Sequence, residues 1–229
     1  MDLDSQLASI DADGRHIAEV TRAAPDRHVP SCPDWTGRDL LAHVSRSTRL
    51  LAAIVEAGGA QPAPLPDLTV DEADATYDEN LQRMIATMRA TPPDAPAFNW
   101  SVTAQVAGFW SRRALHELAV HRWDADTINT AEPAPVPSEV AVDGIAEFFE
   151  VFVPTGLAAG MAPPSPVTLV LEITDTGQRQ EHPLPEPGGP ETVLRGTASD
   201  LLLAVWRRHD PLAHHAGGDP AVLAAWPSI

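Results

Sequence analysis

The chain has 229 residues, of which 44% are hydrophobic and 21% charged, as in an ordinary globular protein of one large or two modest domains. Acidic residues outnumber basic ones by 32 to 15, which gives a formal net charge of -17 at pH 7. This excess of acid argues against nucleic acid or an anionic membrane surface as a partner, because both are bound through basic faces.

Several features favour a cytoplasmic protein. Residues 1–4 carry no basic segment and no apolar run, so we expect no secretory signal. No stretch approaches the roughly 18 consecutive apolar residues that indicate a membrane span. The single cysteine, Cys32, excludes an internal disulfide and suits a reducing compartment. A composition rich in Ala, Asp, Arg and Pro and poor in Lys is typical of a high-GC, actinobacterial type of genome.

Apolar residues recur with helical spacing in five segments that prolines and glycines separate. The predicted helices span residues 3–23, 37–57, 70–89, 104–130 and 138–152. Thr36, followed three residues later by Asp39, resembles a capping box and is expected to begin the second helix. The proline-rich residues 29–35 before it predict a fixed loop, and Pro154 is expected to close the fifth helix.

A different pattern follows the proline-rich residues 161–166. Strands are predicted at residues 167–173, 178–184 and 192–196, then a helix through Trp206 and a short helix at residues 219–226. We therefore expect an α+β fold. An up-down helical bundle, residues 1–160, would precede a small α+β domain, residues 161–229.

The predicted helix at residues 104–130 carries the most suggestive pair of side chains. Glu117 and His121 are four residues apart, so they lie one turn apart on the same helical face and could grip one divalent metal ion. His116 is five residues from His121, about 1.4 turns, and therefore points elsewhere. The string HELAVH is thus not a zinc-protease HExxH motif. The spacing alone also suits a simple surface pair.

A third ligand could come from His43, which falls among apolar residues of the second helix. Asp39 stands one turn earlier and could hold the ring nitrogen that does not bind metal. Equally, His43 could be a buried histidine that is hydrogen-bonded to a backbone carbonyl. The residues alone leave both alternatives open.

Three strings in this chain resemble a known family. VPSCPDWTGRDLLAH, residues 29–43, and RALHELAVHRWD, residues 113–124, are similar to signatures of the mycothiol-dependent maleylpyruvate isomerase family in the DinB-like superfamily. RGTASDLLLAVWRR, residues 195–208, resembles that family's small C-terminal domain more weakly. The resemblance implies that His43, Glu117 and His121 bind a divalent metal, usually described as zinc, on neighbouring helices of a bundle.

The same resemblance implies mycothiol as a second cofactor. One carboxylate and two imidazoles leave zinc with an open position, where a thiol can be held as its thiolate. The expected reaction is attack of this metal-bound thiolate on a small electrophile. It would lead to cis-trans isomerisation of a maleyl-type substrate or to thiol transfer. Cys32 is an alternative thiol, but its proline-rich surroundings indicate a tightly packed structural residue.

A dicarboxylate substrate or a polar thiol would need a cation near the metal, and the resemblance implies Arg208 in this catalytic role. Arg207 stands where the family more often has a small residue, so the role could fall to either arginine. Each could instead simply cap the end of its helix. Trp35 and Trp123 are expected to pack near the site or to line it.

Further residues and rival functions remain as alternatives. Asp124 and Arg122 could support the ligands from outside, whereas His209, His214 and His215 lie in a loop-like stretch and are expected to be solvated. The expected partners are a small electrophile and a low-molecular-weight thiol, and the sequence gives no indication of oligomeric state. A hydrolase that uses zinc-bound water and a metal-binding or small-molecule-binding protein without turnover are the rival functions.

Overall fold

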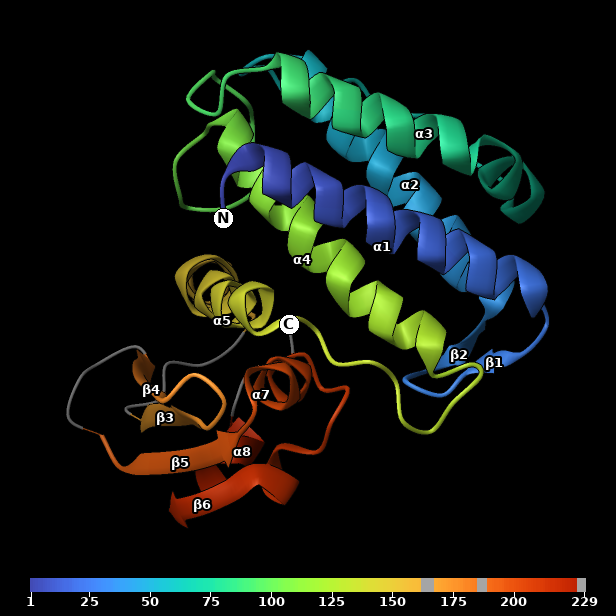
Figure 1. Ribbon diagram of the computed structural model, residues 1–229. Helices are drawn as coiled ribbons and strands as arrows, with labels where there is room; N and C mark the ends of the chain where they lie inside the picture. The colour runs from blue at the N-terminus through green and yellow to red at the C-terminus, as the bar shows by residue number, and fades with distance from the viewer. Residues whose placement is uncertain (162–166, 185–188, 226–229) are drawn as a thin grey trace. The chain divides into compact units, whose positions relative to one another are not determined.

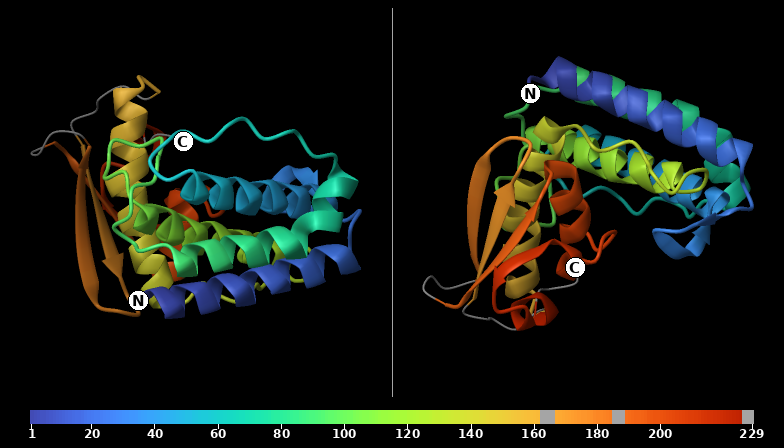
Figure 2. Two further views of the ribbon diagram at one scale, coloured as in Figure 1. Left: turned by 90° about the horizontal axis from the view of Figure 1, so that it is seen from above. Right: turned by 60° about the horizontal axis from the view of Figure 1, so that its bottom comes forward.

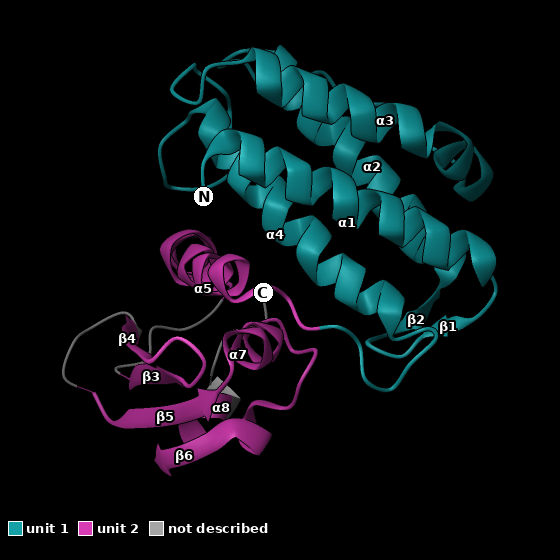
Figure 3. Ribbon diagram, in the orientation of Figure 1, with its two compact units in different colours: residues 1–134 teal, residues 135–229 magenta. Residues whose placement is uncertain are grey.

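The computed structural model describes residues 1–161, 167–184 and 189–225. These residues form two compact units, residues 1–134 and 135–229 (Figure 3). The N-terminal unit is helical and the C-terminal unit combines helices with a sheet, which confirms the predicted α+β class (Figure 1).

The N-terminal unit is a bundle of four long helices with one small hairpin (Figure 1). The helices are α1 (Leu3–Ala23), α2 (Gly37–Glu56), α3 (Val70–Ala90) and α4 (Ala107–Asp126), and the hairpin strands are β1 (His28–Val29) and β2 (Cys32–Thr36). Helix α2 packs against α3 and α4, and α1 packs against α4 and α3. The predicted helical bundle is therefore present.

Side chains at the helix starts explain where α2 and α3 begin. The Asp39 carboxylate accepts a hydrogen bond from the backbone N–H of Thr36 at 2.9 Å, so the predicted capping box is present. Thr69 and Glu72 form the same arrangement before α3. These carboxylates also suit the positive end of the helix dipole.

Two parts of this unit differ from prediction. The expected loop at residues 29–35 contains the β1–β2 hairpin, in which His28 pairs with Thr36. Helix α4 begins at Ala107 rather than residue 104, because the preceding loop has hydrogen bonds of its own. The Asn99 amide donates to the Ala104 carbonyl at 2.7 Å, and Gln105 Oε1 accepts from the Asn99 backbone N–H at 2.6 Å.

The C-terminal unit contains a four-stranded mixed sheet in the order β4-β3-β5-β6. Its strands are β3 (Val167–Ile173), β4 (Gln178–Leu184), β5 (Glu191–Gly196) and β6 (His215–Gly218). Its helices are α5 (Ser138–Glu147), a π-helical turn (Phe148–Phe152), α6 (Val153–Ala158), α7 (Ala198–Val205), a 3-10 turn (Pro211–His214) and α8 (Ala221–Ala225). Helices α5, α6 and α7 lie on one face of the sheet (Figure 2).

The division between the units falls at Ala134 and Pro135, whereas the change in periodicity suggested a boundary between residues 160 and 161. Helix α5 packs against α7, and Ser138 Oγ donates to Asp175 Oδ2 at 2.5 Å. These contacts place α5 with the sheet. Pro154 does not end the helical region, because it stands in the first turn of α6, which follows directly on the π-helical turn.

Two C-terminal predictions fall partly outside what the structure describes. The proline-rich residues 162–166 and residue 226, the last of the predicted helix at residues 219–226, lie outside the described residues. Among the residues that the structure describes, no helix combines the length and apolar character that crossing a membrane requires.

Candidate metal centre

Helices α2 and α4 bring three of the predicted site residues together inside the N-terminal unit. His43 comes from α2, and Glu117 and His121 come from α4, one turn apart. One ligand atom from each of the three lies within 4.8 Å of the others. Among the residues that the structure describes, this is the group of three histidine, cysteine or acidic side chains whose donor atoms converge in this way.

One oxygen of Glu117 is the centre of the cluster. Its Oε1 atom lies 3.0 Å from His43 Nε2 and 3.4 Å from His121 Nε2. Ser47 Oγ approaches the same oxygen at 3.5 Å, which is long for a hydrogen bond. The other oxygen, Oε2, accepts a hydrogen bond from Arg113 Nη2 at 3.0 Å. The two carboxylate oxygens therefore face different partners.

His121 is oriented by a second carboxylate. Its Nδ1 atom lies 2.9 Å from Oδ2 of Asp124, a fully buried side chain. Burial lowers the pKa of His121, but the charges of Glu117 and Asp124 and the hydrogen bonds to them outweigh burial and raise this pKa to about 9. Without metal, His121 is therefore an imidazolium that bridges two carboxylates.

Glu117 shows the complementary effect. Burial raises the pKa of its carboxyl, but His121, His43 and Arg113 together outweigh burial and hold the pKa well below its ordinary value. The group is thus ionised at neutral pH. An ionised carboxylate that faces two imidazoles is suited to receive a cation.

An aromatic side chain lies beside the histidines. The ring centroid of Trp35, on β2, lies 4.8 Å from that of His43 and 6.0 Å from that of His121. The side chain of His43 is 37% exposed and that of His121 only 7%. The cluster is therefore buried on the α4 side and open to solvent near His43. Trp123 is buried in α4.

Other predicted supporting residues have different places. Asp39, which could have supported His43, is held in the capping box with Thr36. The histidine that a carboxylate supports is His121, through Asp124. Arg122 Nη1 donates to Asp126 Oδ2 at 3.0 Å and to the Ala134 carbonyl at 2.6 Å. His116 is fully buried and does not belong to the cluster, as the helical spacing predicted. Cys32 lies in β2.

Arg207 and Arg208 follow helix α7 in the C-terminal unit and have distinct conformations. The backbone N–H of Arg208 donates to the Leu203 carbonyl, and that of Arg207 donates to the Ala204 carbonyl, which is the Schellman pattern. Arg207 has a φ of 60°, the left-handed conformation that glycine usually supplies there. This conformation explains why a small residue would suit position 207. Arg208 is partly buried, and its Nη1 atom donates to the Trp206 carbonyl at 3.1 Å.

The three C-terminal histidines are partly buried rather than fully solvated. The rings of His209 and His214 stack with centroids 5.8 Å apart, and His215 lies in β6, a strand that the sequence did not predict. Burial lowers the pKa of His209. These residues do not join the converging donor group.

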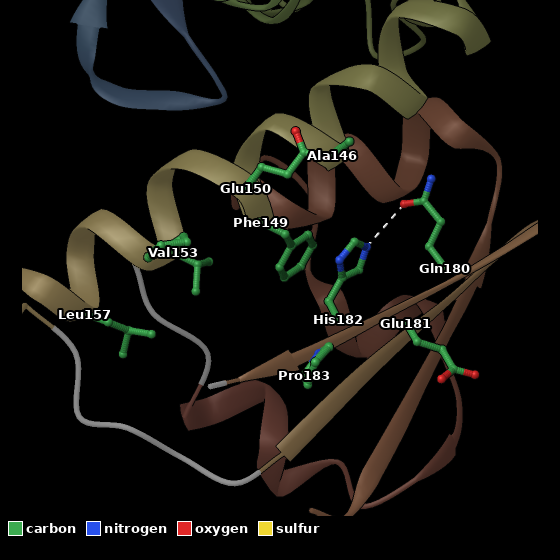
Figure 4. Close-up of a pocket in the computed structure, with 10 residues that line it drawn as sticks. Ala146, Phe149, Glu150, Val153, Leu157, Gln180, Glu181, His182 and Pro183 are labelled. Atoms are coloured by element: carbon green, nitrogen blue, oxygen red, sulfur yellow. Dashed lines mark hydrogen bonds between the residues drawn. The ribbon is translucent and has the colours of Figure 1, made fainter. Parts of the chain in front are cut away.

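The C-terminal unit also holds a cavity of about 680 Å³, lined by α5, the π-helical turn, α6 and β4 (Figure 4). The His182 ring lies flat against the Phe149 ring, with centroids 3.8 Å apart, and His182 Nε2 lies 3.2 Å from Gln180 Oε1. Burial lowers the pKa of His182 to about 4, so this ring is neutral at neutral pH. The cavity is lined by this uncharged imidazole, by the polar side chains of Glu150, Gln180 and Glu181, and by apolar residues.

The sequence did not point to Arg113 or Ser47 as neighbours of the cluster. Arg113 stands four residues before Glu117, the same spacing that links Glu117 to His121, so helical periodicity could have identified it. Ser47 stands four residues after His43 on α2, and the same periodicity places it on the ligand face.

The residues present fit a divalent metal. One carboxylate oxygen and two imidazole nitrogens form a donor set typical of zinc, and three protein ligands leave a further position open. When neutral, His121 would keep its proton on Nδ1 for Asp124 and direct the Nε2 lone pair toward Glu117 Oε1. Fixing the tautomer in this way is how supporting carboxylates prepare a metal ligand.

Comparison with known proteins identifies the family of the chain. The family profile "Mycothiol maleylpyruvate isomerase N-terminal domain" matches residues 7–126, and the profile "MDMPI C-terminal domain" matches residues 139–225. No protein of curated function gives a significant match.

Two solved structures share the fold. The crystal structure of a histidine-to-alanine mutant of the mycothiol-dependent maleylpyruvate isomerase has a TM-score of 0.66 and 18% identity, over 94% of this chain and 92% of that one. A second crystal structure, of the mycothiol-dependent maleylpyruvate isomerase, has a TM-score of 0.64 and 19% identity, over 91% of this chain and 90% of that one. At this identity the likeness establishes the fold, whereas the two profiles together cover most of the chain. The chain therefore belongs to the mycothiol maleylpyruvate isomerase family.

Proposed function

We propose that this protein is a metal-dependent enzyme that uses a low-molecular-weight thiol of the mycothiol type against a small electrophilic substrate. The observation that carries the proposal is the convergence of His43, Glu117 and His121 on one point, with ligand atoms within 4.8 Å of one another. Membership of a family named for a mycothiol-dependent isomerase supports the thiol and the reaction class.

In this proposal Glu117 Oε1 and the Nε2 atoms of His43 and His121 hold zinc or another divalent ion. Asp124 keeps the His121 ring in the tautomer and orientation that this binding needs. A divalent ion at this place would supply the positive charge that lets a thiol ionise near neutral pH. The tilted Trp35 ring and the buried face of α4 limit the approach of water from the other sides.

The open face beside His43 is the entry that we assign to thiol and electrophile, because His43 is the most exposed of the three ligands. The reaction that the family name suggests is cis-trans isomerisation of maleylpyruvate. Addition of a thiolate across its cis double bond leaves a single bond that can rotate, and loss of the same thiolate restores the double bond in the trans form. Thiol transfer begins with the same attack.

Arg208 is our proposed partner for an anionic group of the substrate or the thiol. Its place in the family pattern supports this role, as does its guanidinium, which suits bidentate binding of a carboxylate. We assign Arg207 a structural role, because its left-handed φ of 60° completes the C-terminal end of α7. The proposed catalytic groups therefore number four: the three metal ligands and Arg208.

The test is turnover of maleylpyruvate by zinc-loaded protein with and without added mycothiol. We expect conversion that requires the thiol, falls to background in His43→Ala, and survives in His16→Ala, a histidine of the same unit that contacts Asp126 instead. Arg208→Ala should lower turnover while leaving metal content unchanged.

The outcomes separate the alternatives. Turnover of an ester or amide without thiol would indicate a hydrolase that uses water at the metal. Failure of the zinc-loaded protein to convert maleylpyruvate or any thiol-reactive electrophile, while it still binds the thiol, would contradict the enzymatic proposal and favour a binding protein.

A further inference from the structure

Arg113 makes a contact that separates the two oxygens of Glu117. It stands one helical turn before Glu117 on α4, and its side chain is only 10% exposed. Its Nη2 atom lies 3.0 Å from Oε2, whereas Oε1 faces His43 Nε2 at 3.0 Å and His121 Nε2 at 3.4 Å. The carboxylate is thus oriented by a donor on one side and two imidazoles on the other.

We infer that Arg113 is a positioning residue that holds Glu117 as a one-oxygen metal ligand, with Oε1 toward the metal and Oε2 turned away from it. The inference rests on the proposed metal site and says in addition that Arg113 limits the number of protein atoms that bind the metal. The guanidinium has rigid, planar N–H donors, so it fixes the plane of a carboxylate better than a single point charge does.

The physical reason lies in the freedom of a glutamate side chain. The torsion of a terminal carboxylate is broad, and metal-binding carboxylates use either one or both oxygens. Once Oε2 is bound by Arg113, it is not available as a second ligand. The coordination position that Oε2 would take then stays open for a thiol or substrate. Removal of Arg113 would let the carboxylate turn and occupy it.

The same helix contains a second arginine–carboxylate pair, whose described ion pairs do not include a proposed metal ligand. Arg122 and Asp126 have the same four-residue spacing, lie 3.0 Å apart and have side chains that are 9% and 15% exposed. An ion pair of this kind contributes to the stability of α4 without touching the cluster. Arg122→Met therefore serves as a control for the loss of a buried arginine from this helix.

The test compares metal binding by the wild type, Arg113→Met, Arg113→Lys and Arg122→Met, with Zn²⁺ and with Co²⁺ as a coloured substitute. We expect Arg113→Met to bind Zn²⁺ about 10–100-fold more weakly, the range for loss of a group that supports a ligand. Its Co²⁺ form should absorb visible light more weakly, because a second carboxylate oxygen raises the coordination number. Arg113→Lys should give intermediate affinity, and Arg122→Met should match the wild type in both measurements.

Two outcomes would overturn the inference, and they can be told apart. If Arg113→Met and Arg113→Lys bind Zn²⁺ as the wild type does, with unchanged Co²⁺ spectra, then Arg113 only stabilises the helix. If the wild type itself binds neither ion, the proposed metal site is refuted and the role of Arg113 with it. If Arg113→Met does not fold, the Arg113→Lys variant alone tests the inference, because a displaced Glu117 carboxylate would still change the Co²⁺ spectrum of that variant.

Discussion

The two ring nitrogens of His121 have different tasks. Nδ1 lies 2.9 Å from Asp124 Oδ2 and Nε2 lies 3.4 Å from Glu117 Oε1. In the metal-free chain both nitrogens carry protons, because the two carboxylates raise the pKa of the ring to about 9. A metal ion and the Nε2 proton therefore compete for one lone pair, which couples metal binding to pH.

This competition predicts that zinc affinity rises with pH. Because the pKa of His121 is about 9, Nε2 must release its proton before it can bind a metal at neutral pH. The apparent affinity should increase by up to about tenfold per pH unit below that pKa and level off above it. Calorimetry in two buffers with different ionisation enthalpies should detect about one proton released per metal at neutral pH.

The metal-free chain should show the opposite trend in stability. The pKa of His121 is raised from its ordinary value of 6.5, so its stabilising contribution is complete below pH 6.5 and is lost as the pH rises through about 9. Thermal unfolding of the metal-free chain over this range provides the second readout. A zinc affinity that does not change with pH between these values would contradict the assignment of His121 as a ligand.

At the scale of elements, the start of α2 determines where His43 lies. The backbone N–H of Gly37 donates to the Arg27 carbonyl at 3.0 Å, and that of Arg38 donates to the Pro25 carbonyl at 2.9 Å. A Cβ atom at position 37 would lie 2.7 Å from the Ala24 carbonyl oxygen. The chain that follows α1 therefore packs against the first turn of α2 so closely that only glycine fits.

Gly37→Ala should consequently destabilise the fold. Its methyl group would meet backbone rather than a flexible side chain, so we expect a loss of about 1–3 kcal/mol in the free energy of unfolding, the range for overpacking. Urea denaturation of the metal-free protein measures the change. Gly217→Ala is the control, because its Cβ would meet only Val193 Cγ2 at 4.0 Å. Equal stability of the two variants would refute the close packing at Gly37.

The elements also show what the sequence can predict. Helices α1, α2 and α3 agree with prediction to within a residue or two, because long apolar periodicity marks all three and the Thr36 cap marks the start of α2. The hairpin β1–β2 was missed because β1 has only two residues. Strand β6 has the sequence HAGG, which contains no alternating apolar pattern. Its pairing with β5 depends on contacts distant in sequence.

The sequence likewise predicts part of the candidate site and misses the rest. The spacing of Glu117 and His121 predicts that they share a face of one helix, and the structure places them together. His43 could be added only through the family resemblance, because periodicity within α2 does not reveal which helix lies beside it. The contact between Asp124 and His121 depends on side-chain conformation, which periodicity does not predict. The carboxylate of Asp39, which could have supported His43, accepts from the Thr36 backbone N–H instead.

At the scale of the whole molecule, the proposed tasks are divided between two units. All three proposed ligands lie in residues 1–134, whereas Arg208 lies in residues 135–229. Metal binding is thus expected to depend on the N-terminal unit, and recognition of an anionic group on the C-terminal unit. The family profiles match both parts of the chain.

The most direct test of the proposed metal site is the metal content per chain, determined by elemental analysis of protein purified without a metal-binding tag. The comparison is between the wild type, Glu117→Ala and the control His16→Ala. We expect about one zinc or other divalent ion per chain in the wild type and in His16→Ala, and its loss in Glu117→Ala. A wild type that stays metal-free after zinc is offered, or a Glu117→Ala variant that keeps its metal, would refute the metal site.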